Sequence, residues 1–387
     1  MPSGACVIPY HGKRGTTWSV KYRDADGRQV KRTLGREQDG WNEQRAEREL
    51  GKLLDRVERE RWRKPTRERL STLVDEYLGE YLPSRGRRRT TMLDYTNTLR
   101  RHVMPTLGDV ELATLEARPE LLDRYIAAKR LEGLAPKTIA NHLRTLSAMF
   151  EYARRRRRMT TNPVGLLEPL HVPTPDTPVL SEQEVAALLN AYRVAETASE
   201  PSEAMWWALT RRLTAFALGT ALRRGEILGL RWGDVEMLEQ RLHVRRSFVL
   251  GEMGEPKSRA GRRTVHYGTR TAAVLDKQYQ VSLYRSADSL VFCHPQLGTP
   301  LDASKLSGYM RKAIRAAGIE RNVRAWHDLR HTALTHDAAS GNPAVYVQAR
   351  AGHAQATMTE RYIHAAQVAF PGAAEKAEER LFSSLTE

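Results

Sequence analysis

The chain has 387 residues and carries 62 Lys and Arg against 46 Asp and Glu, which gives a net charge of +16 and a pI of about 10.0. Its length predicts two or three domains. Two distant cysteines, Cys6 and Cys293, argue against a disulfide framework or a cysteine zinc site. The lack of a glycine-rich phosphate loop argues against nucleotide hydrolysis.

The positive charge is spread along the chain. It amounts to +6 in residues 1–64 (16 basic, 10 acidic), +6 in 65–170 (19 and 13) and +4 in 171–387 (27 and 23). This distribution favours a long polyanion that lies against several domains over a single basic tail. No apolar signal region and no run of membrane-spanning length is present, so we expect a cytoplasmic protein.

Residues 5–35 are expected to form strands joined by turns, with a charged helix over 42–61. Trp18 to Tyr22 alternates apolar and polar residues, a turn follows, and Gln29 to Leu34 forms the return strand. A basic set lies on these strands and in the turn: Lys21, Arg23, Arg28, Lys31 and Arg32. It could line an exposed sheet face that enters a DNA groove, and a solvated polar face explains it equally well.

A second domain is expected from Lys64-Pro65 onwards, with helical stripes at 70–81, 90–103 (stopped by Pro105), 119–131 and from Pro136. The last helix has a polar side formed by Lys137, Asn141 and Arg144. Five arginines at its end, residues 154–158, either cap the helix C-terminus or contact DNA phosphates. We favour DNA contact, with Arg154 and Arg155 as the first candidates.

A proline-rich connector over residues 168–178 separates this domain from a larger one that opens with the capping box Ser181-x-x-Glu184. We expect helices at 203–218, 222–230, 269–284 and through most of 303–382, and strands at 241–249, 262–266 and 290–292. The predicted fold is mainly α with small β-sheets. The predicted domains are 1–64, 65–168 and 181–387, with 169–180 as the linker.

Phosphate chemistry is suggested by a stretch near the C-terminus. His327 and Arg330 are three residues apart and share a helix face; His353 and Tyr362 follow. Arg and His stabilise a phosphate or a developing oxyanion, and Tyr can form a covalent intermediate. Taken alone, a buried helical cluster explains these residues equally well.

Two earlier basic segments complete the candidate site. Arg223 begins a short helix with apolar flanks, where it either faces a ligand or forms a salt bridge with Glu226. Lys257 lies in a cationic hairpin with Arg259, a candidate DNA contact. The hairpin could contact DNA, Lys257 could donate a proton to a leaving oxygen, or the segment could be an exposed turn that is merely basic.

Four segments together resemble the tyrosine recombinase (phage integrase) family: residues 220–234, 256–265, 327–332 and 352–362. Ala221 stands where that family often has Gly, and Ala351 where it often has Leu. Residues 66–165 are similar to the family's helical core-binding domain. Residues 1–62 are similar to the arm-binding domain of integrases like that of phage lambda.

The resemblance implies a catalytic set: Arg223, Lys257, His327, Arg330, His353 and Tyr362. It implies a 3′-phosphotyrosyl intermediate on double-stranded DNA, with no metal or other cofactor, core and arm attachment sites, and a homotetramer that forms a Holliday junction. A DNA-bending protein and an excisionase are implied partners, and no membrane is. A tail helix over 373–385 either docks on a neighbouring protomer or is a loosely packed terminal helix. The alternatives are a catalytically inactive DNA-binding regulator of the same fold and a type IB topoisomerase-like enzyme.

Overall fold

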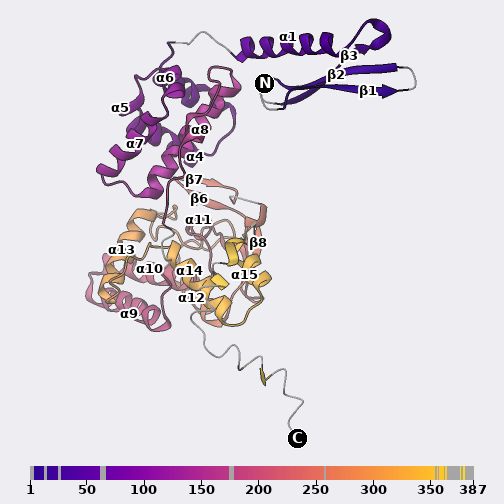
Figure 1. Ribbon diagram of the computed structural model, residues 1–387. Helices are drawn as coiled ribbons and strands as arrows, with labels where there is room; N and C mark the ends of the chain where they lie inside the picture. Colours follow the sequence, from indigo (N-terminus) through magenta and orange to yellow (C-terminus); the bar gives the residue numbers. More distant parts are fainter. Residues whose placement is uncertain are drawn as a thin grey trace. The chain divides into compact units, whose positions relative to one another are not determined.

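The computed structural model describes residues 4–12, 15–24, 28–61, 67–173, 178–256, 259–353, 355, 357–360, 362–363, 375 and 378–379. The chain divides into two compact units, residues 1–174 and 175–387 (Figure 1). The fold is mainly helical with small sheets, as predicted. Among the described helices, none combines the length and apolar character needed to cross a bilayer.

The N-terminal segment is a three-stranded antiparallel sheet covered by one helix. Its strands are β1 (Cys6–Gly12), β2 (Gly15–Arg23) and β3 (Gln29–Arg36), paired in the order β1-β2-β3. After the 3-10 turn η1 (Glu37–Asp39), α1 (Glu43–Arg61) packs on the sheet through Val20, Leu50 and Leu53. This arrangement confirms the predicted sheet and helix.

The strand register decides which basic side chains share the face opposite α1. Val20 packs beneath α1, so Lys21 points to the other face, as do its cross-strand partner Lys31 and Arg23 two residues on. Arg32 pairs with Val20 and therefore lies on the helix side of the sheet. The expectation that Arg32 joins the open face was wrong, because consecutive strand residues alternate faces.

The rest of the first unit is a helical bundle around one apolar core. Its elements are α2 (Leu70–Glu76), η2 (Tyr77–Tyr81), α3 (Leu82–Ser84), α4 (Arg89–Asn97), η3 (Thr98–Val103), α5 (Met104–Leu107), α6 (Leu112–Ala117), α7 (Glu120–Leu131), α8 (Pro136–Arg155) and η4 (Pro163–Leu166).

Two π-helical turns let prolines continue helices in this bundle. The turn η2 precedes Pro83, and η3 precedes Pro105. In a regular α-helix a proline ring clashes with the carbonyl four residues earlier, and a wider π turn moves that carbonyl aside. The predicted helix end at Pro105 was therefore wrong, since the helix continues to Leu107.

The second unit consists of helices around small sheets. Its elements are α9 (Glu182–Ala198), α10 (Pro201–Thr220), α11 (Arg224–Leu228), η5 (Trp232–Asp234), β4 (Val235–Glu236), β5 (Arg241–Val244), β6 (Ser247–Val249), β7 (Glu252–Gly254), η6 (Arg259–Gly261), β8 (Arg263–His266), α12 (Thr269–Val281), α13 (Ala303–Ala316), α14 (His327–Ala339) and α15 (Ala344–Ala351). The Ser181–Glu184 capping box that opens α9 is present as predicted.

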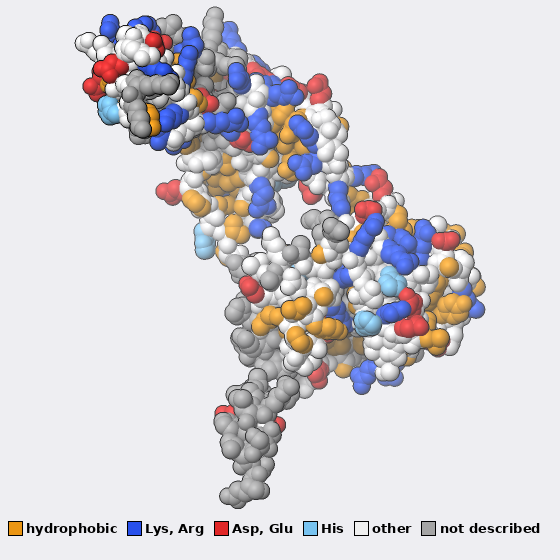
Figure 2. Space-filling model, turned by 90° about the vertical axis from the view of Figure 1, so that its right-hand side faces the viewer, with side chains coloured by type: hydrophobic (Ala, Val, Ile, Leu, Met, Phe, Trp, Pro, Cys, Tyr) orange, Lys and Arg blue, Asp and Glu red, His pale blue; other side chains and the backbone are white. Residues whose placement is uncertain are grey.

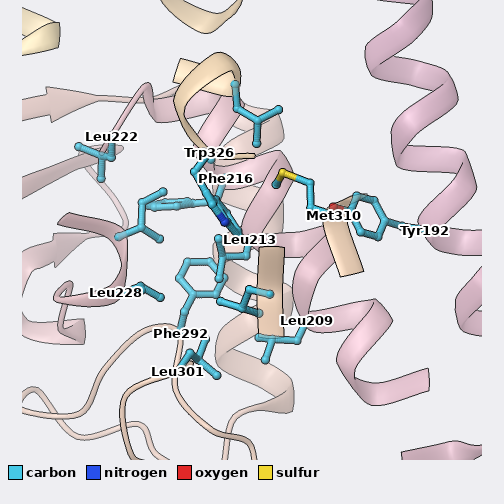
Figure 3. Close-up of a cluster of buried hydrophobic side chains, with 14 of the residues drawn as sticks. Tyr192, Leu209, Leu213, Phe216, Leu222, Leu228, Phe292, Leu301, Met310 and Trp326 are labelled. Carbon is cyan, nitrogen blue, oxygen red and sulfur yellow. The ribbon is translucent and has the colours of Figure 1, made fainter. Parts of the chain in front are cut away.

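The core of this unit gathers around α10. Figure 3 shows Leu209, Leu213 and Phe216 of that helix among Phe292 and Trp326 from distant parts of the chain. These side chains are at most 4% exposed. The core thereby fixes the end of α10 and the start of α14, from which the candidate catalytic residues project.

The strand expected over 241–249 is interrupted at Arg245 and Arg246. Both arginines donate to the carboxylate of Asp234, which is 2% exposed. Consecutive side chains of a regular strand point to opposite faces, so two neighbours can reach one carboxylate only where the strand breaks. The expected strand at 290–292 is also absent as an extended strand, because Leu290 forms only an isolated bridge with Arg231.

Candidate active site

Arg330 is the buried centre of the site. From α14, its Nη1 donates to the carbonyl oxygen of Ala221 (2.6 Å) and its Nη2 to that of Ala351 (2.6 Å). Nη2 also lies 3.3 Å from Nε2 of His353. Burial, and then the charge of Arg223, lowers the pKa of Arg330 to about 9. The guanidinium is therefore still charged at neutral pH and is held by the ends of two other helices.

A sharp turn places the start of α14. Trp326 has φ 71° and ψ −43°, and the His327 amide donates to the carbonyl of Ala325 (2.9 Å) across it. This conformation is costly for a bulky residue, and burial of the indole with a hydrogen bond to Ser307 (3.0 Å) holds it in place. The turn sets the direction in which His327 leaves the core.

Arg223 is oriented by a buried carboxylate. Glu226, 4% exposed, accepts from Arg223 Nη1 (2.9 Å) and from both Nη atoms of Arg263 (3.2 and 2.9 Å). Burial alone would raise the pKa of Glu226, but the hydrogen bonds from Arg263 and the charges of Arg263 and Arg223 together lower it. The predicted Arg223–Glu226 pair thus exists, and it points Arg223 while leaving its side chain 39% exposed.

His353 follows directly on a left-handed glycine. Gly352 ends α15 with φ 64°, and a Cβ there would lie 2.8 Å from the carbonyl oxygen of Ala260, so only glycine fits. The His353 ring hydrogen-bonds to Thr359 Oγ1 through Nδ1 (3.1 Å). Burial, and then the charge of Arg330, lowers the pKa of His353 to about 4. The imidazole is neutral near pH 7.

Tyr362 lies beside two imidazoles. Its ring is stacked on His353 (centroids 5.7 Å apart, 11° between planes) and tilted against His331 (5.1 Å, 36°). The side chain is 5% exposed. Its hydrophobic neighbours form one cluster: Ala221, Ala333, Leu334, Val347 and Ala351. The phenol is therefore held by the same helix ends that anchor Arg330.

His331 was not among the site residues predicted from the sequence. Its Nε2 lies 2.8 Å from Nε2 of His327, one helical turn earlier. Burial first, and then the charge of His327, lowers the pKa of His331 to about 4; burial also lowers the pKa of the more exposed His327. The i, i+4 spacing of the two histidines was the sequence signal that could have identified the pair.

A metal ligand set is only partly present around this pair. His327, Asp328 and His331 place possible ligand atoms within 4.8 Å of one another. The Asp328 carboxylate, however, is fully buried and accepts from the Arg324 amide (2.7 Å) and guanidinium (2.8 and 3.1 Å). Two imidazoles remain, fewer than the three or four protein ligands of a zinc site.

Described contacts join Arg330 to His353 and His353 to Tyr362, and the charge of Arg223 acts on Arg330. His327 reaches Tyr362 through His331. Lys257 lies outside the described residues. Arg259 begins the turn η6, and only its backbone is described.

The candidate DNA contacts of the first unit differ in their surroundings. Lys137, Asn141 and Arg144 form an exposed stripe on α8, opposite its buried apolar side. Arg154 and Arg155, also exposed, are both paired with Glu151.

In the N-terminal segment, the exposed Arg28 lies at a turn and donates its amide to Asp24 (2.9 Å). Figure 2 shows Lys and Arg side chains on the surface of both units.

The last arginine of the run, Arg158, faces inward and not toward solvent. It binds the carboxylates of Glu68 and Glu76, both far away in sequence, and is 19% exposed. The expectation that all five arginines face DNA is therefore wrong for Arg158, because the two carboxylates from α2 and the residues before it draw its side chain into the bundle.

Comparison with known families gives two matches. Residues 178–368 match the phage integrase family, and residues 74–157 match the N-terminal SAM-like domain of phage integrases. Together the two segments include every described residue of the candidate site.

Similar curated proteins come from several bacteria. The chain is 26% identical to a tyrosine recombinase XerC-like protein of Caldanaerobacter subterraneus over 63% of its own length and 66% of the relative. It is 26% identical to the prophage integrase IntR of Escherichia coli (59% and 57%) and 25% identical to a putative prophage phiRv2 integrase of Mycobacterium tuberculosis (76% and 74%). The chain thus spans less than two thirds of the length of the first two relatives.

Solved structures share the fold. The Tn1549 transposon integrase in complex with a circular intermediate DNA matches with a TM-score of 0.64 at 20% identity, over 80% of this chain and 99% of that chain. A lambda integrase dimer bound to a COC′ core site matches with a TM-score of 0.61 at 19% identity, over 92% and 94%. A lambda integrase tetramer bound to a Holliday junction matches with a TM-score of 0.60 at 20% identity, over 92% and 94%.

Proposed function

The chain belongs to the phage integrase family of tyrosine recombinases, and on this basis we propose that it is a site-specific recombinase that cuts and rejoins DNA through Tyr362. The observation that carries the proposal is the position of the Tyr362 ring, which contacts two imidazoles and shares its supporting cluster with the anchor of Arg330. A nucleophile, neutral bases and a buried cation are thus gathered at one place.

In the proposed reaction, Tyr362 Oη attacks the scissile phosphorus. The Oη–P bond forms, the bond from phosphorus to the 5′-oxygen breaks, and a 3′-phosphotyrosyl link holds the cut strand. The 5′-hydroxyl of a partner strand then attacks the phosphorus, the Oη–P bond breaks, Tyr362 regains its proton, and the phosphodiester is restored. A phenol has a pKa near ~10, so the site must take its proton and stabilise the charge that develops on phosphorus.

Arg330 and Arg223 would stabilise the non-bridging oxygens. The contacts of Arg330 with Ala221, Ala351 and His353 use three of its five N–H donors, which leaves two for a phosphate. Arg223 remains 39% exposed while Glu226 fixes its direction. Two oriented guanidiniums supply the positive charge that a metal ion supplies in other phosphoryl-transfer enzymes.

His353 would donate a hydrogen bond to a phosphate oxygen, and the geometry sets a condition for this. Nε2 faces Arg330, which has only donors, so Nε2 is an acceptor in the structure. Donation to phosphate requires the other tautomer, in which Nδ1 accepts from Thr359. The Thr359 hydroxyl supports both states because it can donate or accept.

His327 would act as general base or proton relay for Tyr362, and Lys257 would protonate the leaving 5′-oxygen. The role of Lys257 rests on its place in the family motif. We further propose that the substrate is double-stranded DNA, bound at core sites by the helical bundle and at arm sites by the N-terminal sheet. A homotetramer would exchange strands through a Holliday junction, and a bending protein and an excisionase would assist, all in the cytoplasm.

Covalent capture on DNA of randomised sequence tests the proposal and needs no defined attachment site. The full chain is incubated with nicked duplexes of randomised sequence, denatured in detergent, and the protein-linked strands are sequenced. We expect an adduct at the 3′ end of the cut strand, none with Tyr362→Phe, and an unchanged adduct with Tyr346→Phe, a tyrosine on α15 that is 40% exposed. An adduct that persists with Tyr362→Phe would refute the assignment.

The same assay separates the alternatives. A regulator that has lost catalysis would bind DNA and give no adduct with the unsubstituted chain. A topoisomerase-like enzyme would give adducts without a common sequence and would relax supercoiled plasmid.

A further inference from the structure

We infer that His331 is a further catalytic residue of the recombination reaction, which accepts the proton of Tyr362 and shares it with His327. The inference deepens the proposed function and rests on it. It follows from the contacts that His331 makes in both directions, toward the nucleophile and toward the exposed histidine.

The first observation is the order of the side chains. Among the described residues, the imidazoles in ring contact with Tyr362 belong to His331 and His353. His327, the residue that the family motif assigns as the base, contacts His331 instead: the rings are 4.4 Å apart at 77°, and the two Nε2 atoms are 2.8 Å apart. His331 therefore stands between the phenol and the motif histidine.

The second observation concerns hydrogen-bond chemistry. Two Nε2 atoms at 2.8 Å require that one imidazole carries the hydrogen and the other accepts it. The pair is thus one unit that holds a single shared hydrogen between its rings. When His331 gains a proton on the side of the phenol, it can pass the shared hydrogen to His327, which is exposed and can release a proton to water.

The third observation is that the second histidine near Tyr362 is committed elsewhere. His353 accepts from Arg330 through Nε2 and bonds Thr359 through Nδ1. Both ring nitrogens are therefore occupied, one by Arg330, which is proposed to bind the phosphate, and one by Thr359. Of the two imidazoles that contact Tyr362 among the described residues, His331 is therefore the one whose contacts favour proton transfer, through its pair with His327.

The surroundings of His331 keep the pair neutral and therefore able to accept. Arg324, Asp328 and Arg330 act on it from the start of α14 and the segment before it, and His353 and Tyr362 lie on the segment after α15. Asp328 is already neutralised by Arg324. Burial, and then the charge of His327, keeps His331 neutral near pH 7, which is the state in which an imidazole can accept a proton.

The proton balance needs nothing beyond the chain, the DNA and water. On cleavage, the Tyr362 O–H bond breaks, the Oη–P bond forms, and the proton enters the His331–His327 pair, while a separate acid protonates the leaving 5′-oxygen. On rejoining, the 5′-oxygen bonds to phosphorus and its proton returns to that acid, the Oη–P bond breaks, and Oη takes a proton back from the pair. No other reactant is needed.

The test measures the rate of adduct formation by His331→Ala and His331→Gln under single-turnover conditions. The substrate is a nicked duplex with the sequence that covalent capture identifies. Gln can keep a hydrogen bond to His327 but cannot take a proton. We expect both variants to form the adduct about 10²-fold more slowly, as for loss of a general base, with unchanged DNA affinity. His336→Gln on the same helix, where Gln can still donate to the Leu180 carbonyl, is the matched control and should cleave normally.

Two further measurements distinguish proton sharing from a packing role. Added imidazole should partly restore the rate of His331→Ala. A substrate with sulfur in place of the leaving 5′-oxygen needs no acid and should not restore it, because the defect lies on the nucleophile side. A near-normal rate of adduct formation for either variant would overturn the inference. Rescue by the sulfur substrate would also overturn it. Failure of the proposed function would show differently, as no adduct with the unsubstituted chain.

Discussion

Arg330 Nη1 is hydrogen-bonded over 2.6 Å to the carbonyl oxygen of Ala221, a residue in the left-handed conformation (φ 54°, ψ 24°) that ends α10. The left-handed turn aims this carbonyl away from the helix axis and into the site. A backbone conformation that is unfavourable for any side chain thus positions one half of the phosphate clamp. It also accounts for the glycine that the family often has at this place.

Replacement of Ala221 tests this relationship. Ala221→Gly should change the free energy of unfolding by less than about 1 kcal/mol, because relief of the left-handed strain is offset by the more flexible unfolded chain. Ala221→Val should lower it by about 2 kcal/mol or more, since a β-branched residue is strongly disfavoured at positive φ, and should slow adduct formation. Urea unfolding and covalent capture give the two readouts; equal behaviour of the two variants would contradict the role of the turn.

Substitutions of Arg330 and Arg223, the two arginines proposed to bind the phosphate, should differ in their effect on stability but not in their effect on cleavage. Arg330→Lys leaves at least one of two buried carbonyls unsatisfied, so we expect a loss of about 1–3 kcal/mol in the free energy of unfolding. Arg223→Lys keeps the partly exposed pair with Glu226 and should cost less than about 1 kcal/mol. Both should reduce cleavage by about 10²-fold or more, because lysine cannot replace a planar two-donor contact. Equal unfolding curves for the two variants would contradict the buried anchor.

Glu226 is expected to be a main support of the site. Glu226→Gln leaves Arg263, whose side chain is 6% exposed, without its charged partner, and should lower the free energy of unfolding by about 3–5 kcal/mol. The matched control is Asp288→Asn, which removes the partner of Arg231 at a 92% exposed carboxylate and should cost less than about 1 kcal/mol.

The sign of the pH dependence follows from the lowered pKa of Glu226. Its stabilising charge is present above its ordinary value of 4.5 and is lost as the pH falls further. The Gln variant and the unsubstituted chain should therefore differ at pH 7 and converge in acid. A difference that persists in acid would show that shape and not charge is lost.

The buried histidines should also make the free energy of unfolding fall as the pH falls, but over a different pH range from Glu226. The folded chain keeps His353 and His331 neutral down to about pH 4, whereas the unfolded chain protonates them near 6.5. Between these values the unfolded chain binds more protons, so the free energy of unfolding should fall as the pH drops from 6.5 toward 4. Unfolding measured across this range should show a weaker dependence of the free energy of unfolding on pH for His353→Gln than for the unsubstituted chain. An unchanged pH dependence would contradict the burial of a neutral imidazole.

The sequence predicted the parts of the protein that local patterns determine. The apolar stripe of α8 and the capping box at Ser181 were both predicted in this way. Long-range contacts decided the rest. The break at Arg245 depends on a carboxylate earlier in the chain, and the contact between His331 and Tyr362 depends on folding that brings two distant segments together.

Substitution of two arginines, one in α8 and one just after it, should distinguish an arginine that contacts DNA from one that stabilises the fold. Arg144 is exposed on the polar stripe with Lys137, whereas Arg158 is bound to Glu68 and Glu76. If the stripe lies on DNA, Arg144→Gln should weaken binding to a short duplex of arbitrary sequence and reduce the dependence of log affinity on log salt by about 0.9, the value for one phosphate contact. The fold should be unaffected, since the substituted side chain is exposed.

Arg158→Gln should have the opposite pattern. Loss of the guanidinium leaves two partly buried carboxylates close together without a cation, so we expect the free energy of unfolding to fall by about 2 kcal/mol or more. The salt dependence of binding should stay as it is, because Arg158 faces Glu68 and Glu76 within the bundle. Fluorescence anisotropy over a series of KCl concentrations and urea unfolding of both variants provide the comparison. A reduced salt dependence for Arg158→Gln, together with an unchanged one for Arg144→Gln, would move the DNA-binding surface away from the α8 stripe and toward the end of the arginine run.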